Sequence, residues 1–451
     1  MSLYDLMIRN GSLLTPGAIE IADLATVAGR VVAIGPQLEG SATEEIDARG
    51  LHVFPGVIDA HVHFNEPGRT EWEGFASGTR ALAAGGTTSF AEMPLNASPP
   101  TLDAASFALK KQSAEASALV DFALWGGLVP QNLAHLDELA ECGVIGFKAF
   151  MSNSGIEDFS AVDDASLYEG MRRAAQLKKI VAVHAEDEQL TSELAREAMA
   201  QGRTGIRDYL RSRPVQAELN AISKAIQFAE ETSCALHIVH VSSGSGVVLV
   251  AEARARGIDV SCETCPHYLV LTEVDVERLG AVAKCAPPLR SQEVQEHLWQ
   301  QLFAGNIQLI GSDHSPAPAS MKTASNFFQV WGGISGCQSF LSLLLTEGYA
   351  ARELSLSMLM ELTAEAVARR FHLPQKGRIT VGADADLVLV NLQAHTELQK
   401  EDLQYRHQQS PYIGRKMQGT IQQTLVRGVT VYRSGVFNPA AHGQFLMPVR
   451  D

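Results

Sequence analysis

The sequence predicts an α/β protein in which a (β/α)8 TIM-type barrel carries a small composite β-sandwich built from both chain ends. Two observations in its middle predict the barrel. An apolar run, a polar or Gly-containing loop and a stretch with helical spacing follow one another there, and this unit occurs eight times. A third observation predicts the sandwich, because both ends carry short strand-like pieces broken by Gly and Pro. An open doubly wound sheet is the alternative, and the count of eight favours the barrel.

The eight runs are continuous rather than alternating, which is typical of parallel strands that helices cover on both faces. They span residues 53–60, 87–92, 120–124, 144–150, 180–183, 236–241, 260–264 and 307–311.

The strand-like pieces at the two ends are too few on either side for an independent core. They span residues 4–14, 18–34 and 44–53 before the barrel and 377–392 and 422–432 after it. We therefore expect residues 1–52 and 377–451 to pair into one sandwich and residues 53–376 to form the barrel.

Composition excludes several classes of protein. The chain has 451 residues, of which 46% are hydrophobic, so it can bury a large core. Lys and Arg number 36 against 51 Asp and Glu, which gives a net charge of −15 and disfavours nucleic acid and anionic membranes as partners. No apolar run approaches the roughly 20 residues that span a bilayer, and residues 1–10 lack the features of a signal peptide. We expect a cytoplasmic protein.

Six cysteines in so long a chain do not resemble a disulfide framework, and we expect reduced thiols. Cys262 and Cys265 have the spacing of a zinc knuckle. No second closely spaced pair follows them, so the four ligands of a structural zinc site are not available.

Polar side chains stand at the carboxyl ends of the predicted strands, where the active sites of such barrels lie. They are His61 and His63 after the first run, Lys148 inside the fourth, His184 after the fifth, His240 at the end of the sixth and Asp313 after the eighth. Each has an ordinary structural explanation when taken alone, because a lone His often satisfies a backbone group. Together at one rim, the histidines and the aspartate predict a metal site.

Lys148 is unusual because its strand is apolar, and a buried ammonium must be paired, neutralised or chemically changed. A salt bridge to a nearby acid is one reading. The other is a carbamate formed with CO2, whose oxygens can bridge two cations. Charge counting favours the carbamate, because Asp313 alone would leave most of the charge of two divalent cations beside a cationic amine.

A pair of cations about 3.5–4 Å apart lowers the pKa of a shared water and supplies hydroxide at neutral pH. Asp313 would ligate one cation, accept the proton of the attacking water and pass it to the departing nitrogen. The expected chemistry is hydrolysis of an amide or ester without a covalent enzyme intermediate.

These motifs resemble those of the cyclic amidohydrolases, the group of dihydroorotase, dihydropyrimidinase and allantoinase. The resemblance covers residues 4–445 and is nearest to the allantoinase branch. The motifs that resemble that branch in order and spacing lie at residues 72–80, 92–96, 312–316, 331–333, 375–378 and 405–412.

Two departures separate the branches. Dihydroorotases of this type place an arginine where this chain has Asn65, and a neutral amide suits a substrate without a carboxylate. Dihydropyrimidinases place an oxyanion-stabilising tyrosine where this chain has Asn153. Asn65 is therefore one candidate for a substrate contact. Asn96, at the end of the second strand, and Ser315, just after Asp313, are two more candidates, although both are equally compatible with loop capping.

The resemblance implies hydrolysis of the ring amide of allantoin to allantoate in purine breakdown, by a homotetramer. Zinc fits the ligand chemistry best, and cobalt or manganese would also fit. A hydantoinase or dihydroorotase is the alternative within the group. A non-catalytic scaffold homologue is the alternative from another class, and the full ligand set disfavours it.

Overall fold

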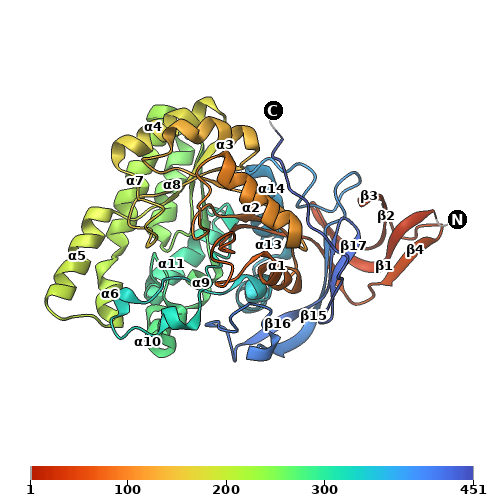
Figure 1. Ribbon diagram of the computed structural model, residues 1–451. Helices are drawn as coiled ribbons and strands as arrows, with labels where there is room; N and C mark the ends of the chain where they lie inside the picture. Colours follow the sequence, from red (N-terminus) through yellow and green to blue (C-terminus); the bar gives the residue numbers. More distant parts are fainter. Residues whose placement is uncertain (1–2, 450–451) are drawn as a thin grey trace.

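The computed structural model describes residues 3–449, in which the predicted parallel strands form two sheets (Figure 1). One sheet has the order β6-β7-β8, and the other has the order β14-β13-β12-β11-β10-β9. Each of the eight predicted runs overlaps one of the parallel strands. The strands are β6 (Val57–Val62), β7 (Thr87–Glu92), β8 (Asp121–Leu124), β9 (Gly126–Gly127), β10 (Gly146–Phe150), β11 (Ile180–His184), β12 (Leu236–Ile238), β13 (Val260–Thr264) and β14 (Leu309–Ile310).

Backbone hydrogen bonds link the two sheets on both sides. The Ile145 N–H donates to the Leu124 carbonyl at 3.0 Å, and the His63 N–H donates to the His314 carbonyl at 2.8 Å. Val62 and His314 also form a parallel bridge. The ends of the first and last parallel strands therefore lie side by side, which brings residues far apart in sequence to one place.

Helices separate the parallel strands and surround them (Figure 1). They are α1 (Phe75–Ala84), α2 (Ala104–Ser117), α3 (Leu136–Cys142), α4 (Asp164–Gln176), α5 (Glu188–Ala200), α6 (Ile206–Ser212), α7 (Val215–Thr232), α8 (Gly244–Ala255), α9 (Pro266–Val270), α10 (Glu273–Leu279), α11 (Gln292–Phe303), α12 (Phe340–Leu343), α13 (Leu356–Met360) and α14 (Ala366–Arg370). None of the described helices is both long and apolar enough to cross a bilayer.

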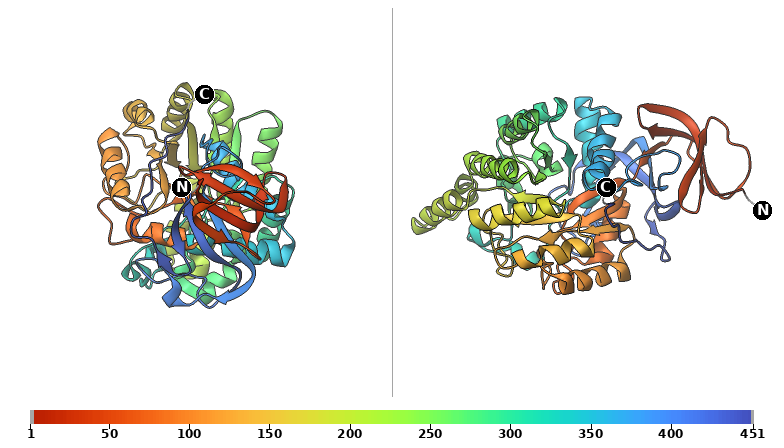
Figure 2. Two further views of the ribbon diagram at one scale, coloured as in Figure 1. Left: turned by 90° about the vertical axis from the view of Figure 1, so that its right-hand side faces the viewer. Right: turned by 90° about the horizontal axis from the view of Figure 1, so that it is seen from above.

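Strands from the two chain ends pair in one nine-stranded sheet. Strand β5 runs antiparallel to β15 and joins the two halves. Strands β1–β4 project from one side of the molecule (Figure 2). The strands are β1 (Tyr4–Thr15), β2 (Ala18–Val27), β3 (Arg30–Gly35), β4 (Ala42–Asp47), β5 (His52–Pro55), β15 (Leu387–Glu397), β16 (Lys416–Val426), β17 (Val429–Arg433) and β18 (Val436–Phe437). The outermost predicted domain bounds, residues 1 and 451, lie outside the described residues.

The first predicted run, 53–60, is divided between two sheets. It breaks at Gly56, between β5 and β6. A Cβ at Gly56 would lie 2.0 Å from Thr88 Oγ1, so only glycine allows the chain to pass β7 this closely.

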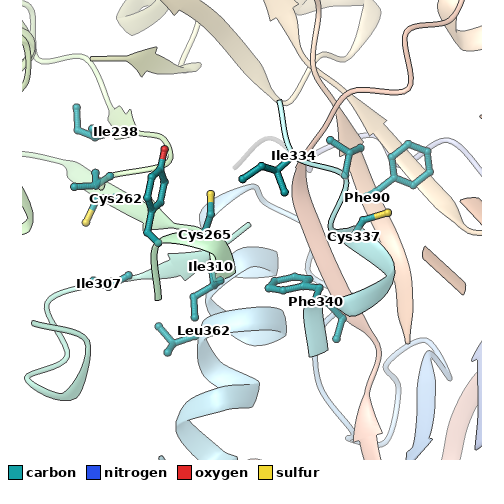
Figure 3. Close-up of a cluster of buried hydrophobic side chains, with 14 of the residues drawn as sticks. Phe90, Ile238, Cys262, Cys265, Ile307, Ile310, Ile334, Cys337, Phe340 and Leu362 are labelled. Carbon is teal, nitrogen blue, oxygen red and sulfur yellow. The ribbon is translucent and has the colours of Figure 1, made fainter. Parts of the chain in front are cut away.

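All six cysteines are unpaired. Cys262 and Cys265 lie in an apolar cluster with Ile310 (Figure 3). Their spacing therefore serves packing in this structure.

Candidate metal centre

His61, His63 and Asp313 come together where β6 and β14 end. Asp313 Oδ1 lies 3.2 Å from His61 Nε2 and 3.4 Å from His63 Nε2. One ligand atom from each of the three residues lies within 4.8 Å of the other two. These two imidazole nitrogens and one carboxylate oxygen have the chemistry and spacing to share a cation.

His184 and His240 form a second pair beside the first. His184 ends β11, and His240 follows β12 by two residues. His184 Nδ1 lies 3.1 Å from His240 Nε2, and the ring centroids of His240 and His61 are 5.4 Å apart. The four histidines predicted as ligands therefore form one cluster.

Lys148, on β10, is fully buried, and its Nζ has no hydrogen-bond partner among the described residues. Burial lowers the pKa of this amine to about 7, although Asp313 opposes the shift. Burial is the main cause that lowers the pKa values of His63, His184 and His240, and the charge of Lys148 lowers them further. The amine is thus electrostatically coupled to both halves of the histidine cluster.

The protonation states in this cluster suit metal binding. Burial lowers the pKa of His63 to about 4 and lowers those of His184 and His240, so these rings are neutral at pH 7. Burial by itself raises the pKa of Asp313, but His61 and His63 outweigh it and hold that pKa at about 2. Asp313 is therefore ionised at neutral pH and can accept a proton.

Two buried glutamates that the sequence interpretation missed orient the histidines. Glu263 contacts His61 Nδ1 through one oxygen and lies 3.2 Å from His237 Nε2 through the other. Such contacts fix the ring so that its opposite nitrogen faces the site. Because His61 lowers the pKa of Glu263 despite burial, this carboxylate remains ionised.

Glu186 has the same relation to His184. Its Oε2 lies 2.8 Å from His184 Nε2 and also contacts Arg213. Burial raises the pKa of Glu186, but Arg213 overcomes this and holds the pKa at about 2. Both residues could have been noticed in the sequence, because Glu263 lies inside an apolar strand and Glu186 lies just after one. A carboxylate buried at such a position needs a partner.

The three predicted substrate contacts are buried near the site, and their side chains make few hydrogen bonds. Asn65 Nδ2 donates to the Pro316 carbonyl at 3.4 Å, while Asn65 Oδ1 has no partner among the described residues. Ser315 is held through its backbone N–H, which donates to the Ile334 carbonyl at 3.0 Å. The Asn96 carbonyl accepts a hydrogen bond from Arg69 Nη1 at 3.1 Å.

The backbone is strained at two of the predicted ligands and at two of the predicted substrate contacts. Asn65, Asn96, His240 and Asp313 have φ angles of 65°, 69°, 41° and 45°. Left-handed backbone at non-glycine residues is costly and concentrates at functional sites.

Two further positions make local contacts. Asn153 is exposed, and its Oδ1 accepts the Gly155 N–H at 2.8 Å within its own loop. The ring of His314, next to Asp313 in the sequence, accepts the Gly336 N–H at Nδ1 and packs on Tyr405.

The donor set fits a pair of divalent cations. Among the six predicted ligands, the buried nitrogen atoms without a hydrogen-bond partner in the described part of the chain are His63 Nδ1, His240 Nδ1 and Lys148 Nζ. Imidazole and carboxylate donors suit zinc and also accept cobalt or manganese.

Comparison with protein families and known sequences points to one group. The model of the Amidohydrolase family matches residues 52–431. The chain is 57% identical to a protein named allantoinase from Rubrobacter xylanophilus, over 100% of this chain and 99% of that protein. It is 54% identical to one of the same name from Deinococcus radiodurans, over 99% of each chain.

Solved structures of similar fold carry related names. An L-hydantoinase (dihydropyrimidinase) from Arthrobacter aurescens is 36% identical, with a TM-score of 0.96 over 99% of this chain and 100% of that one. A dihydropyrimidinase from Brevibacillus agri is 31% identical, with a TM-score of 0.91 over 99% of each chain.

Proposed function

The chain belongs to the amidohydrolase family, and from this membership we propose that it is an enzyme that hydrolyses the ring amide of allantoin to allantoate in purine catabolism. The observation that carries the proposal is the full-length similarity to proteins named allantoinase, at 57% and 54% identity. The cluster of four histidines, Lys148 and Asp313 supports it, because these groups suit hydrolysis of an unactivated amide.

His61, His63 and Asp313 would hold one divalent cation, and His184 and His240 a second. Lys148 would bridge the two as a carbamate. When bound, such cations polarise a carbonyl and lower the pKa of a shared water. Zinc is the proposed metal. The lowered pKa of Lys148 supports the carbamate, because only the neutral amine attacks CO2.

Asp313 is the proposed proton carrier. Its carboxylate accepts a proton from the attacking water as the carbon–oxygen bond forms, and returns it to the ring nitrogen as the carbon–nitrogen bond breaks. Asn65, Asn96 and Ser315 would hydrogen-bond the substrate. Asn65 retains a free buried carbonyl oxygen that can accept from a ureide N–H.

We further propose that the two linked parallel sheets form one closed (β/α)8 barrel over residues 53–376. Residues 1–52 and 377–451 would form its sandwich. The hydrogen bonds at both sheet edges and the β5–β15 pairing support this arrangement. A cytoplasmic homotetramer is the proposed assembly and location, on family resemblance.

A hydantoinase is the second candidate, because the solved structures at TM-scores of 0.96 and 0.91 carry that activity in their names. Asn153, where that branch has an oxyanion-stabilising tyrosine, argues against it, and Asn65 argues against dihydroorotase. The scaffold alternative predicts no bound metal.

The test uses purified protein supplied with zinc and bicarbonate. Rates on allantoin, dihydroorotate and 5-substituted hydantoins are compared, and bound metal is measured. Allantoate formation as the fastest reaction supports the proposal. Faster turnover of a hydantoin, or metal-free protein without activity, would overturn it.

A further inference from the structure

We propose that His267 is a further substrate-binding residue, which hydrogen-bonds an edge of the hydantoin ring. The inference deepens the proposed function and rests on it. His267 lies on α9, three residues after the end of β13. That strand stands between β12 and β14, whose ends lead to His240 and Asp313, and none of the six predicted ligands comes from it.

His267 differs from every other buried histidine in the described part of the chain. It is 1% exposed, and neither of its ring nitrogens has a hydrogen-bond partner there. The other buried rings each have at least one polar contact; His237, for example, contacts Ser261 and Glu263. Leaving buried polar atoms unpaired is destabilising, so the unpartnered nitrogens of this ring lower the stability of the fold.

The ring lies within electrostatic reach of the candidate metal centre but outside its donor set. Burial lowers the pKa of His267 to about 4, and Asp313 opposes this shift electrostatically. The tight donor group comprises His61, His63 and Asp313 without His267. His267 is therefore placed to meet a molecule bound beside the cations rather than the cations themselves.

A neutral imidazole offers one N–H donor and one nitrogen acceptor. A cyclic ureide offers the complementary pair, since each ring nitrogen carries a hydrogen next to a carbonyl oxygen. Binding of such a ring would satisfy the two orphaned nitrogens. The neighbouring side chains are already committed, because Cys265 packs with Ile310 (Figure 3) and Tyr268 donates its hydroxyl hydrogen to the Pro287 carbonyl at 2.7 Å.

The test compares His267→Leu and His267→Gln with Tyr268→Phe, a control that removes a buried hydrogen bond from the same helix. The measurements are kcat and KM for allantoin, the inhibition constant of unsubstituted hydantoin, bound metal and melting temperature. We expect H267L to lower kcat/KM by about 10–100-fold and to weaken hydantoin binding about 10-fold, with wild-type metal content. H267Q, which keeps a donor and an acceptor, should recover most of the loss, and Y268F should not reproduce it.

Hydantoin binding by H267L within twofold of wild type would overturn the inference, as would equal losses in H267L and H267Q. Loss of bound metal in H267L would instead make His267 a support of the ligands and would also overturn it. Wild-type protein that does not hydrolyse allantoin would refute the proposed function, and this arm keeps the two failures apart.

Discussion

Two fully or nearly buried lysines occupy opposite chemical settings in this molecule. Lys148 has no hydrogen-bond partner among the described residues, whereas Lys376 Nζ lies 2.6 Å from Asp121, 2.7 Å from Asp386 and 3.0 Å from Asp384. Burial lowers the pKa of Lys148 to about 7, while for Lys376 the carboxylates overcome burial and raise the pKa. The difference lies in the partners, since both side chains are withdrawn from water.

The two settings also lie at different places in the fold. Lys148 belongs to the histidine cluster at the carboxyl ends of the parallel strands. Asp121 begins β8 and Asp386 precedes β15, so Lys376 lies where the parallel sheet meets the nine-stranded sheet. In proteins built from parallel strands followed by helices, catalytic residues gather at the carboxyl ends of the strands, while residues at the amino ends serve stability. An unpaired buried lysine therefore indicates chemistry, and a paired one indicates structure.

Replacing Lys148 should have the largest effect on activity. We expect K148A to lower kcat/KM by about 10³-fold or more and to reduce bound metal, because a bridging ligand supplies several kcal/mol of transition-state stabilisation. Short carboxylic acids added to the assay should restore part of the activity. Near-normal turnover of K148A would remove the carbamate from the account.

Asp313→Asn should have the second-largest effect on activity. Loss of the proton carrier should lower kcat by about 10²-fold or more, while the melting temperature and much of the metal content are retained. The measurement is steady-state kinetics with metal analysis of the same sample. A wild-type kcat would exclude Asp313 as the base.

Glu263→Gln should have a smaller effect, again on the histidine cluster that contains Lys148. The amide keeps the size of the side chain but weakens its hold on His61, so zinc affinity should fall about 10–100-fold. Competition with a chelator measures it. Equal zinc affinity in E263Q and wild type would show that this contact does not tune the site.

Lys376→Met should instead affect stability. Three carboxylates would lose their shared cation, and breaking a buried ion pair costs about 3–5 kcal/mol of unfolding free energy. Metal content and kcat should stay near wild type below the melting temperature. If fully folded K376M lost its bound metal, Lys376 would not have the purely structural role that separates it from Lys148.

The pH dependence should separate the lysines as well. Because the pKa of Lys376 is raised, its ion pairs stabilise the fold fully below about pH 10.4 and weaken only above it. The K376M substitution should therefore lower the free energy of unfolding by the same amount at pH 7 and pH 9. The lowered pKa of Lys148 means that the unfolded chain binds an extra proton between about pH 7 and 10.4. In metal-free, CO2-free protein, K148M should therefore have a larger free energy of unfolding than wild type at pH 7, and this difference should disappear by pH 10. Chemical unfolding at each pH measures both, and a K148M effect that does not change with pH would contradict the shift.

Several parallel strands were predictable because they are apolar runs long enough to stand out, as at Thr87–Glu92, where prediction and structure agree at both ends. Strand β9 (Gly126–Gly127) was not predicted, because two glycines form no apolar run. The break at Gly56 was not predictable either, because its cause is Thr88 on another strand. Local sequence does not show which strand passes close to which.

The same limit applies to the site. His61, His184 and Asp313 could be named because polar residues after apolar runs lie at one rim. Glu263 could not be assigned to His61, since the two are 202 positions apart and meet only through the packing of the strands. The lack of hydrogen-bond partners at both ring nitrogens of His267 among the described residues follows from tertiary packing, which the sequence does not show.

The most direct test of the central claim is diffraction from crystals of active protein, with data collected at the absorption edge of the metal it retains. We expect two anomalous peaks, with the imidazole nitrogens of His61 and His63 about 2.0–2.1 Å from one of them and those of His184 and His240 equally close to the other. Branched density on Lys148 should reach both peaks. An unmodified Lys148 amine with no anomalous peak beside the histidines, in crystals that turn over allantoin, would contradict it.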